Sequence, residues 1–419
     1  MPLHSSYQPA PAWPSLGPSF ADPARPASFP RHALRFRNDR AAEEVGLHTL
    51  TDAEWVEHFG LLRPLPRNVD PPLALRYHGH QFQSYNPWIG DGRGFLHGQL
   101  LDRRGRVLDL GTKGSGTTPY SRGGDGRLTL KGAVREILAT ELLEALGVTT
   151  SRTLSVIETG ENLVRHDEPS PTRGAVLVRL SHGHVRFGTF QRQAYERSPE
   201  RLARLLEFAV DGYYPELAEQ GAPDLAAAFL DAVVQRCARL VAQWTLAGFV
   251  HGVLNTDNMN ITGESFDYGP WRFLPNYDPD FVAAYFDHGG LYAFSKQGDA
   301  VAWNLVRLAE TLLPLSSEAA LTPPLAAFVP RLHAATTEQL LWRLHLRSAG
   351  PEADHRLLAA VYAFLQASQC PYERFFFDWF GGDAGRAMAS ARAGIYAGEA
   401  FADFRAQLAE RGIGLVLVP

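Results

Sequence analysis

The apolar positions along the chain follow two different patterns, and the change falls near residue 200. Between residues 74 and 192, short apolar runs are separated by dense glycines, which is typical of strands joined by turns. The strands predicted from these runs cover residues 94–101, 107–111, 153–158 and 174–180. Beyond residue 200 the apolar positions recur at helical spacing instead. The pattern therefore predicts a strand-rich first half and a helical second half.

One strong helix is predicted inside the strand-rich half, where Gly147 follows the apolar positions as a stop signal. Its apolar residues are Leu130, Val134, Ile137, Leu138, Leu142 and Leu146. In the second half, Asp224 caps a long helix that ends near Gly248, and another helix covers residues 299–313. Residues 252–290 form a long stretch rich in Asp, Asn and aromatic residues. Loops of that length inside a compact domain are usually functional.

This order of elements predicts an α+β fold with two lobes, like that of a protein kinase. We expect a small β-rich lobe with one key helix over residues 74–200, and a larger helical lobe with the catalytic and metal-binding loops over residues 201–419. Residues 1–73 are expected to form an N-terminal extension, in which Thr51 and Glu54 make a helix capping box. The proline-rich residues 1–30 are expected to be a flexible arm that drapes over the body of the protein.

Composition narrows the class of protein and its partners. A charged fraction of 20% is ordinary for a globular protein, and a net charge of −5 gives no reason to expect a nucleic-acid partner. No apolar run is long enough to cross a membrane, and the start lacks the apolar stretch of a secretory signal. Two cysteines, Cys237 and Cys370, cannot build a disulfide framework. We therefore expect a cytoplasmic protein without nucleic-acid or membrane partners.

The stretch from His251 to Pro270 carries the strongest chemical signal, because it places an Asp-Asn pair shortly before an Asp-aromatic-Gly. Transfer of a phosphoryl or nucleotidyl group from ATP needs oxygen ligands for a divalent metal and an acceptor for the proton of the attacking hydroxyl. We assign Asp257 as that base, and Asn258 and Asp267 as metal ligands. A short hairpin over residues 259–266 is expected to bring Asp267 opposite Asn258. The alternative is that these side chains only satisfy hydrogen bonds in turns.

Further candidates for the nucleotide site lie in the strand-rich half. Lys113 ends a predicted strand and Glu136 projects from the predicted helix, an arrangement that holds a triphosphate in kinase-like folds. Glycine-rich turns beside basic residues allow main-chain amides to approach phosphates, and forked guanidinium groups suit a polyphosphate. The candidates in these turns and among the arginines are Gly90, Gly92, Arg93, Asp125, Gly126, Arg179 and Arg186.

Two other groups of residues have structural interpretations. The histidine pairs His78/His80 and His182/His184 have strand spacing but lack a third metal ligand, so polar packing is favoured over a zinc site. The aromatic cluster at residues 375–380 is expected to pack in the core.

The blocks of sequence around these candidates resemble the selenoprotein O (SelO, YdiU) family over residues 74 to 310. The matching blocks cover residues 77–82, 89–93, 113–122, 124–127, 135–136, 186–188, 251–259 and 267–270. The resemblance implies a pseudokinase fold that binds ATP in a flipped orientation and transfers AMP to Ser, Thr or Tyr of proteins, with release of pyrophosphate. It implies Mg²⁺ or Mn²⁺ at Asn258 and Asp267.

The same resemblance implies roles for the other candidates and exposes departures from the family. Asp257 would be the proton acceptor, Lys113, Arg179 and Arg186 would contact the phosphates, and Glu136 would position Lys113. Gly90, Gly92, Arg93, Asp125 and Gly126 would line the nucleotide site. Gln83, Ser84 and Trp88 depart from the family pattern, and residues 412–419 lack the Cys or selenocysteine that many members carry near their C-terminus.

Two other functions remain open from the sequence. A conventional phosphotransferase is favoured by the Lys113–Glu136 pair and the Asp-Tyr-Gly, and it would release ADP. A non-catalytic nucleotide-binding scaffold is favoured by the unusual residues 83–88.

Overall fold

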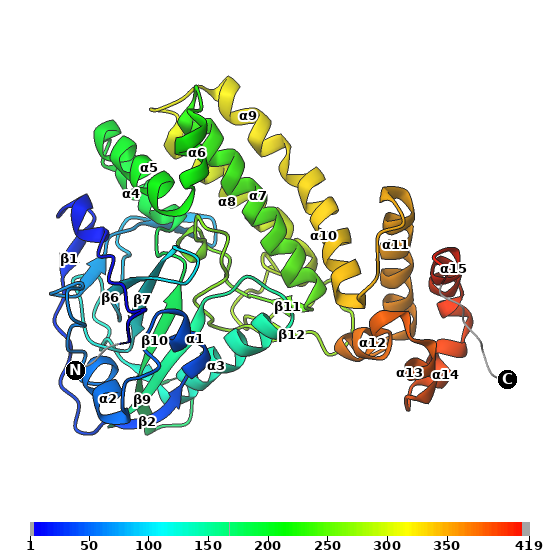
Figure 1. The fold of residues 1–419 in the computed structure, drawn as a ribbon, viewed down its shortest axis with the longest axis horizontal. Coiled ribbons are helices and arrows are strands. Elements are labelled where there is room, and N and C mark those ends of the chain that lie inside the picture. The colour runs from blue at the N-terminus through cyan, green and yellow to red at the C-terminus, as the bar shows by residue number, and fades with distance from the viewer. Residues whose placement is uncertain (1–3, 167, 413–419) are drawn as a thin grey trace.

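A computed structural model describes residues 4–166 and 168–412 and shows a mixed α/β fold (Figure 1). The strands are β1 (Ala21–Pro23), β2 (Ala33–Arg37), β3 (Leu73–Leu75), β4 (Gly79–Gln81), β5 (Ser84–Asn86), β6 (Leu96–Leu101), β7 (Val107–Lys113), β8 (Leu128–Thr129), β9 (Arg152–Leu163), β10 (Thr172–Ser181), β11 (Phe249–Val250) and β12 (Arg272–Phe273).

Most of the helices follow the strands along the chain. They are α1 (Asp39–Glu44), α2 (Asp52–Phe59), α3 (Leu130–Ala145), α4 (Phe187–Tyr195), α5 (Pro199–Tyr213), α6 (Pro215–Gln220), α7 (Leu225–Leu246), α8 (Gln297–Leu312), α9 (Glu318–Ala326), α10 (Phe328–Leu344), α11 (Pro351–Ser368), α12 (Tyr372–Asp378), α13 (Ala384–Ala389), α14 (Ala393–Ala397) and α15 (Ala402–Glu410). Short 3-10 helices are η1 (Trp13–Leu16), η2 (Thr256–Asn258), η3 (Phe294–Lys296), η4 (Phe380–Gly382) and η5 (Glu399–Phe401).

Within the described residues, eight strands form one sheet with the order β1-β3-β6-β7-β10-β9-β2, and β8 pairs with β10. β7 and β10 are antiparallel neighbours near the middle of this order. Side chains of directly opposed residues lie on the same face of a sheet. One face therefore carries the opposed pairs Asp109 and Ser181, Gly111 and Arg179, and Lys113 and Leu177.

The main elements predicted from the sequence are confirmed. The four predicted strands correspond to β6, β7, β9 and β10, and the predicted helices correspond to α3, α7 and α8. The side chain of Asp224 accepts a hydrogen bond from the Ala227 amide and caps α7. Thr51 and Glu54 make the expected capping box at α2. These local signals were sufficient because each depends on residues close in sequence.

The helix α3 turns a different face to the sheet from the one that its apolar spacing suggests. Val134, Leu138 and Leu142 are exposed, with Leu138 57% exposed, whereas the buried side chains are mostly small or polar. The buried residues are Ala133, Glu136, Ala139, Thr140 and Leu143. Small residues let the helix lie close to β9 and β10, and that approach brings Glu136 to the sheet face that carries Lys113.

The part of the expected arm that the structure describes, residues 4–30, lies over the body of the protein and is anchored there by large side chains. Trp13, Leu16 and Phe20 are almost fully buried in the largest hydrophobic core. Trp13 packs edge-on against Phe208 of α5, and the Arg204 guanidinium donates to the Ser15 carbonyl. β1 and β2 also join the main sheet. The arm is held because its few large apolar side chains are buried, although proline dominates its composition. The lobe boundaries at residues 73 and 200 stay a prediction.

Among the described residues, the helices of the second half contribute to two hydrophobic cores, and the larger of these also contains residues of the first half such as Leu75 and Leu143. α5, α7 and α8 belong to the largest core, while α11, α12 and α15 pack around a second core farther along the chain (Figure 1). Phe375, Phe376 and Trp379 are buried in that second core, as expected for the aromatic cluster, whereas Phe377 and Phe380 are partly exposed. In the described part of the chain, no helix is long and apolar enough to cross a membrane.

Candidate active site

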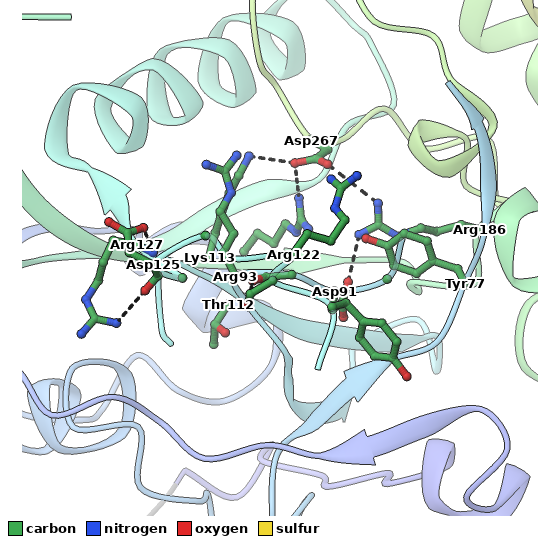
Figure 2. Close-up of a pocket in the computed structure, with 18 of the residues that line it drawn as sticks. Tyr77, Asp91, Arg93, Thr112, Lys113, Arg122, Asp125, Arg127, Arg186 and Asp267 are labelled. Carbon is green, nitrogen blue, oxygen red and sulfur yellow. Dashed lines mark hydrogen bonds and ion pairs between the residues drawn. The ribbon is translucent and has the colours of Figure 1, made fainter. Parts of the chain in front are cut away.

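A cavity of about 400 Å³ opens between the sheet face and the loops that follow β5, β7 and η2 (Figure 2). Most of the charged side chains in its wall are arginines. The lining residues are Tyr77, Gly90, Asp91, Gly92, Arg93, Gly94, Thr112, Lys113, Tyr120, Ser121, Arg122, Gly124, Asp125, Gly126, Arg127, Arg165, Arg179, Arg186 and Asp267. Such a concentration of guanidinium groups suits a ligand with several negative charges.

Asp267 is the anion on which the nearby cations converge, and Figure 2 shows Lys113 and Arg186 pointing toward it. Its carboxylate lies 2.7 Å from Lys113 Nζ, 3.6 Å from Arg179 Nη1 and 3.8 Å from Arg186 Nη1. Burial opposes its ionisation, but these three cations hold the pKa of Asp267 well below its usual range. The residue has a left-handed backbone with φ 63°, which Asp tolerates better than most residues.

Lys113 is held from two sides, because its Nζ also donates to Glu136 of α3. Both Lys113 and Glu136 are buried. Lys113 is the last residue of β7, so the strand fixes its backbone while α3 supplies the carboxylate. The structure thus brings together the pair that the sequence predicted.

Arg179 and Arg186 lie against aromatic rings that orient their guanidinium planes. Arg186 stacks over Tyr77 and Phe266, and Arg179 over Phe266, with centroid distances of 4.4, 4.8 and 5.3 Å respectively. Arg186 Nη1 also donates to the backbone oxygen of Asp257 at 2.7 Å. Both arginines are buried against these rings, so their positive charges have fixed positions and are largely shielded from water.

The short turn η2 holds Asp257 beside this cluster. Its neighbour Thr256 accepts from the His80 amide and donates to Gln191, both at 2.7 Å. Asn255 accepts from the Phe82 amide at 3.0 Å and from the Tyr292 hydroxyl at 2.8 Å. These contacts anchor the turn to the β4–β5 hairpin, so Asp257 is placed by residues far from it in the sequence.

The carboxyl group of Asp257 has the opposite electrostatic character to that of Asp267. Burial raises the pKa of Asp257 to about 6, against the opposing charge of Arg186. Among the described residues, its Oδ1 atom is buried without a hydrogen-bond partner. A carboxylate with a raised pKa and a free oxygen is suited to accept a proton.

The predicted hairpin over residues 259–266 is not formed. Asn260 pairs with Arg186 and Ser265 pairs with Thr150, so the two arms of the expected hairpin bind different partners. Gly263 does make a tight turn, with its amide donating to the Asn260 carbonyl at 3.1 Å. Each arm is paired with a backbone segment of the first half of the chain, so the two arms do not pair with each other.

Both glycine-rich turns lie on the cavity wall, the one with Asp91 beside Arg186 and the other at the end that holds Asp125 (Figure 2). A Cβ atom at Gly90 would lie 2.5 Å from the Tyr120 ring, so only glycine allows this approach. Gly126 has φ +68°, a conformation that favours glycine. Asp125 is paired with Arg165 at 2.8 Å and faces an arginine-rich end of the cavity.

The donor set near Asp257 fits a hard divalent cation. The Asn258 amide nitrogen donates to the Val253 carbonyl at 3.1 Å, which leaves its side-chain oxygen as an acceptor. Asp267 lines the cavity, whereas Asn258 and Asp257 are not among its lining residues. Carboxylate and amide oxygens are the ligand types that Mg²⁺ takes alongside substrate phosphates. Within residues 4–166 and 168–412 there is no group of three His, Cys, Asp or Glu side chains placed to hold a metal by themselves.

Several residues of the cavity were not predicted as site residues, among them Tyr77, Arg122, Arg127 and Arg165. Tyr77, Arg122 and Arg127 lie in the sequence blocks that carry the family resemblance, so that signal was available. Arg165 has no such signal, because it reaches the cavity from the loop after β9 only through the fold.

Comparison with known proteins gives a consistent result over most of the chain. The family model described as protein adenylyltransferase SelO matches residues 3–395. A protein of Synechocystis sp. named protein nucleotidyltransferase YdiU is 50% identical over 382 residues, which cover 89% of this chain and 79% of the relative. A protein of the same name from Synechococcus elongatus is 51% identical over 375 residues, covering 87% of this chain and 74% of that relative.

Proposed function

The chain belongs to the SelO family of protein adenylyltransferases and is a nucleotidyltransferase, and we propose that it transfers AMP from ATP to Ser, Thr or Tyr hydroxyls of other proteins. The single observation that carries the proposal is the cavity, in which three cations surround Asp267, together with Asp257 behind it, whose backbone accepts from Arg186 and whose buried Oδ1 has no partner among the described residues. One end of that cavity thus offers both charge for phosphates and an acceptor for a proton.

We infer the orientation of the nucleotide from the side chains at the two ends of the cavity. In Figure 2, Arg127 and Asp125 lie at the end opposite to Arg186 and Tyr77. Arg186 contacts Asp257, so the phosphorus that is attacked belongs at the Arg186 end. The other two phosphates then extend toward Arg93, Arg127 and the glycine-rich turn that holds Asp125. This flipped orientation presents the innermost phosphorus to the acceptor hydroxyl.

In the reaction we propose, Asp257 accepts the proton of the attacking hydroxyl. The hydroxyl oxygen forms a bond to the α-phosphorus as the bond from that phosphorus to the bridging oxygen breaks, and pyrophosphate leaves. Lys113, Arg179 and Arg186 stabilise the charge that moves onto the phosphate oxygens, and Glu136 keeps Lys113 in place. Asn258 and Asp267 would hold Mg²⁺ or Mn²⁺, which when bound neutralises phosphate charge.

The finer assignments of fold and location belong to the same proposal. We infer that the sheet and α3 form the small lobe of a kinase-like fold and that residues 201–419 form the larger lobe, a division that the change from strands to helices along the chain supports. We also propose a cytoplasmic location, which the two buried, free cysteines support.

Labelled ATP tests the reaction class. The protein is incubated with a protein acceptor mixture and with ATP labelled at either the α- or the γ-phosphate. We expect the α label on protein and the γ label in pyrophosphate. Label on protein from the γ position alone, with ADP as the second product, would show a conventional phosphotransferase and refute the proposal.

A further inference from the structure

A buried chain of polar side chains lies on the sheet face behind Arg179. Gln99 Nε2 donates to Asp109 Oδ1 at 2.8 Å, Asp109 Oδ2 lies 3.1 Å from His184 Nδ1, and Arg179 Nε donates to His184 Nε2 at 3.2 Å. All four side chains are buried, and neither Gln99 nor Asp109 has measurable exposure. None of the first three lines the cavity, so the proposed transfer reaction gives them no task.

The contacts of Gln99, at the end away from Arg179, fix the direction of every hydrogen bond in this series of side chains. Gln99 Oε1 accepts from the backbone amides of Ala12 and Trp13, at 2.7 and 2.8 Å, so its amide nitrogen must face Asp109. Asp109 can only accept, which makes His184 Nδ1 the protonated nitrogen. The unprotonated Nε2 then accepts from Arg179.

The sheet leaves room for this arrangement at one position. Gly111 lies between Asp109 and Lys113 on β7, directly opposite Arg179. A Cβ atom there would lie 2.4 Å from His184 Nε2, so the imidazole ring crosses β7 where a side chain is missing. Burial also lowers the pKa of His184, in agreement with a neutral ring, although Asp109 opposes that shift.

The chain ends on a cation that has spare hydrogen-bonding capacity. Arg179 uses Nε for His184, and among the described residues its buried Nη1 has no hydrogen-bond partner and lies 3.6 Å from Asp267. The guanidinium plane is therefore set from behind, while its outer edge faces the cavity. If His184 Nε2 carried the proton, two donors would face each other, and the guanidinium plane of Arg179 would rotate away.

We propose that Asp109 and His184 are positioning residues for the phosphates of the nucleotide, and that they act by holding Arg179 through a fixed His184 tautomer. The proposal rests on the proposed role of Arg179 as a phosphate contact. It extends the nucleotide site along the sheet face to the backbone of residues 12 and 13, which set the direction of the hydrogen bonds through Gln99.

The test measures binding of α,β-methylene-ATP, which cannot release pyrophosphate, by calorimetry with Mg²⁺ present. In Asp109→Asn the new side chain has one acceptor and one donor, but both of its neighbours, Gln99 Nε2 and His184 Nδ1, are donors. One donor therefore faces another, unless His184 changes tautomer and then faces Arg179 with a donor. We expect affinity about tenfold weaker, the effect of losing one hydrogen bond to a charged group. In the transfer reaction KM for ATP should rise more than kcat falls.

A compensating substitution gives the decisive result. Gln99→Glu alone places two carboxylates side by side, and we expect it to weaken binding as well. In Gln99→Glu/Asp109→Asn the introduced carboxylate accepts from the backbone amides and from the new amide nitrogen, so the bond between positions 99 and 109 runs in the opposite direction. The amide oxygen at position 109 again accepts from His184 Nδ1, and every donor meets an acceptor at the same net charge. We expect the double variant to recover most of the wild-type affinity. If the loss of binding free energy in the double variant equals the sum of the losses in the two single variants, the proposal is overturned.

Controls separate this inference from the proposed function. Ser181→Ala changes the same buried cluster without changing any donor or acceptor of the chain, and should leave affinity within about twofold, since its contacts with the His184 ring are long. If Arg179→Ala does not weaken binding, the phosphate role of Arg179 fails. If it does, but Asp109→Asn weakens binding equally in the Arg179→Ala background, the chain does not act through Arg179 and the inference fails.

Thermal unfolding of each variant shows whether it is folded. Should Asp109→Asn not fold, Gly111→Ala displaces the His184 ring while keeping every polar group, and normal nucleotide affinity in that variant would contradict the proposal.

Discussion

At the scale of single residues, the candidate site separates two neighbouring carboxylates by their surroundings. Burial raises the pKa of Asp257 to about 6, whereas Lys113, Arg179 and Arg186 outweigh burial and hold the pKa of Asp267 well below its usual range. Pairs of acids whose pKa values are pushed apart in this way usually have different tasks in a reaction. Here one is suited to take a proton and the other to stay charged.

Asp257→Asn should therefore act on turnover more than on binding. The amide is nearly the same size, and the backbone oxygen that accepts from Arg186 is kept. We expect kcat to fall by about 10²–10⁴-fold while the affinity for ATP changes little. Steady-state kinetics and calorimetry measure the two quantities. Asp267→Asn is the matched comparison, and it should weaken nucleotide binding. Full activity in Asp257→Asn would contradict the assignment of the base.

Glu264 gives a prediction for stability rather than for activity. Burial raises its pKa from 4.5 to about 7, although the His182 amide that donates to it opposes the shift. The folded state thus holds a proton that the unfolded chain releases, so this group lowers the stability of the protein as the pH rises from about 4.5 to about 7.

Glu264→Gln removes this loss and keeps an oxygen for the His182 amide. We expect the variant to gain stability over the wild type between pH 5 and pH 8, by on the order of 3 kcal/mol at the upper end. Urea unfolding at several pH values measures the difference. A difference that does not change with pH would show that Glu264 is ionised in the folded state at pH 5.

The residues of the site were predictable where the chemistry is local to a motif. Asp257, Asn258 and Asp267 stand close together in the sequence with types that suit metal and proton chemistry, and Lys113 and Glu136 lie at the ends of predictable elements. Arg165 and Gln99 were not predictable, because each gains its role from a partner brought near by the sheet. Periodicity and composition carry no information about such pairs.

At the scale of elements, α3 shows why a helix can be predicted correctly while its buried face is not. Its large apolar residues Val134, Leu138 and Leu142 are exposed, and small residues with Glu136 face the sheet. Helical spacing identifies the helix, but which side is buried depends on how closely the sheet approaches. The need to bring Glu136 to Lys113 decides the side in this protein.

Substitutions on the two faces of α3 should therefore differ in cost. Leu138→Gln lies on the exposed face, and we expect a change in unfolding free energy within about 0.5 kcal/mol. Leu143→Ala empties a fully buried position, and we expect a loss of about 2–5 kcal/mol. Urea denaturation of both variants measures this. Equal costs would mean that the ridge of Val134, Leu138 and Leu142 is covered in solution.

At the scale of the whole molecule, the N-terminal stretch is part of the fold rather than an addition to it. β1 and β2 lie at the two ends of the sheet order, and Trp13 is buried among the helices of the second half. The sequence did not predict this, because a proline-rich composition obscures a few widely spaced apolar anchors. What those anchors contact depends on residues some 200 positions later, which no local pattern can reveal.

Trp13→Ala should accordingly destabilise the protein strongly. The side chain is 1% exposed and packs against Phe208, so its removal leaves a large cavity. We expect the free energy of unfolding to fall by about 3–5 kcal/mol. Trp88→Ala is the matched control, because Trp88 is 76% exposed and its loss should cost about 0.5 kcal/mol or less. A mild effect of Trp13→Ala would restore the view of a loosely attached arm.

The contact between Ser15 and Arg204 also has a consequence for how the protein is made. The two residues are separated by 189 positions, so the ribosome releases the first long before the second exists. At about 5–20 residues per second, the delay is roughly ten seconds or more. Throughout that interval Trp13, Leu16 and Phe20 face water without their helices. The emerging chain is therefore a natural client for chaperones that bind short apolar stretches at the exit tunnel.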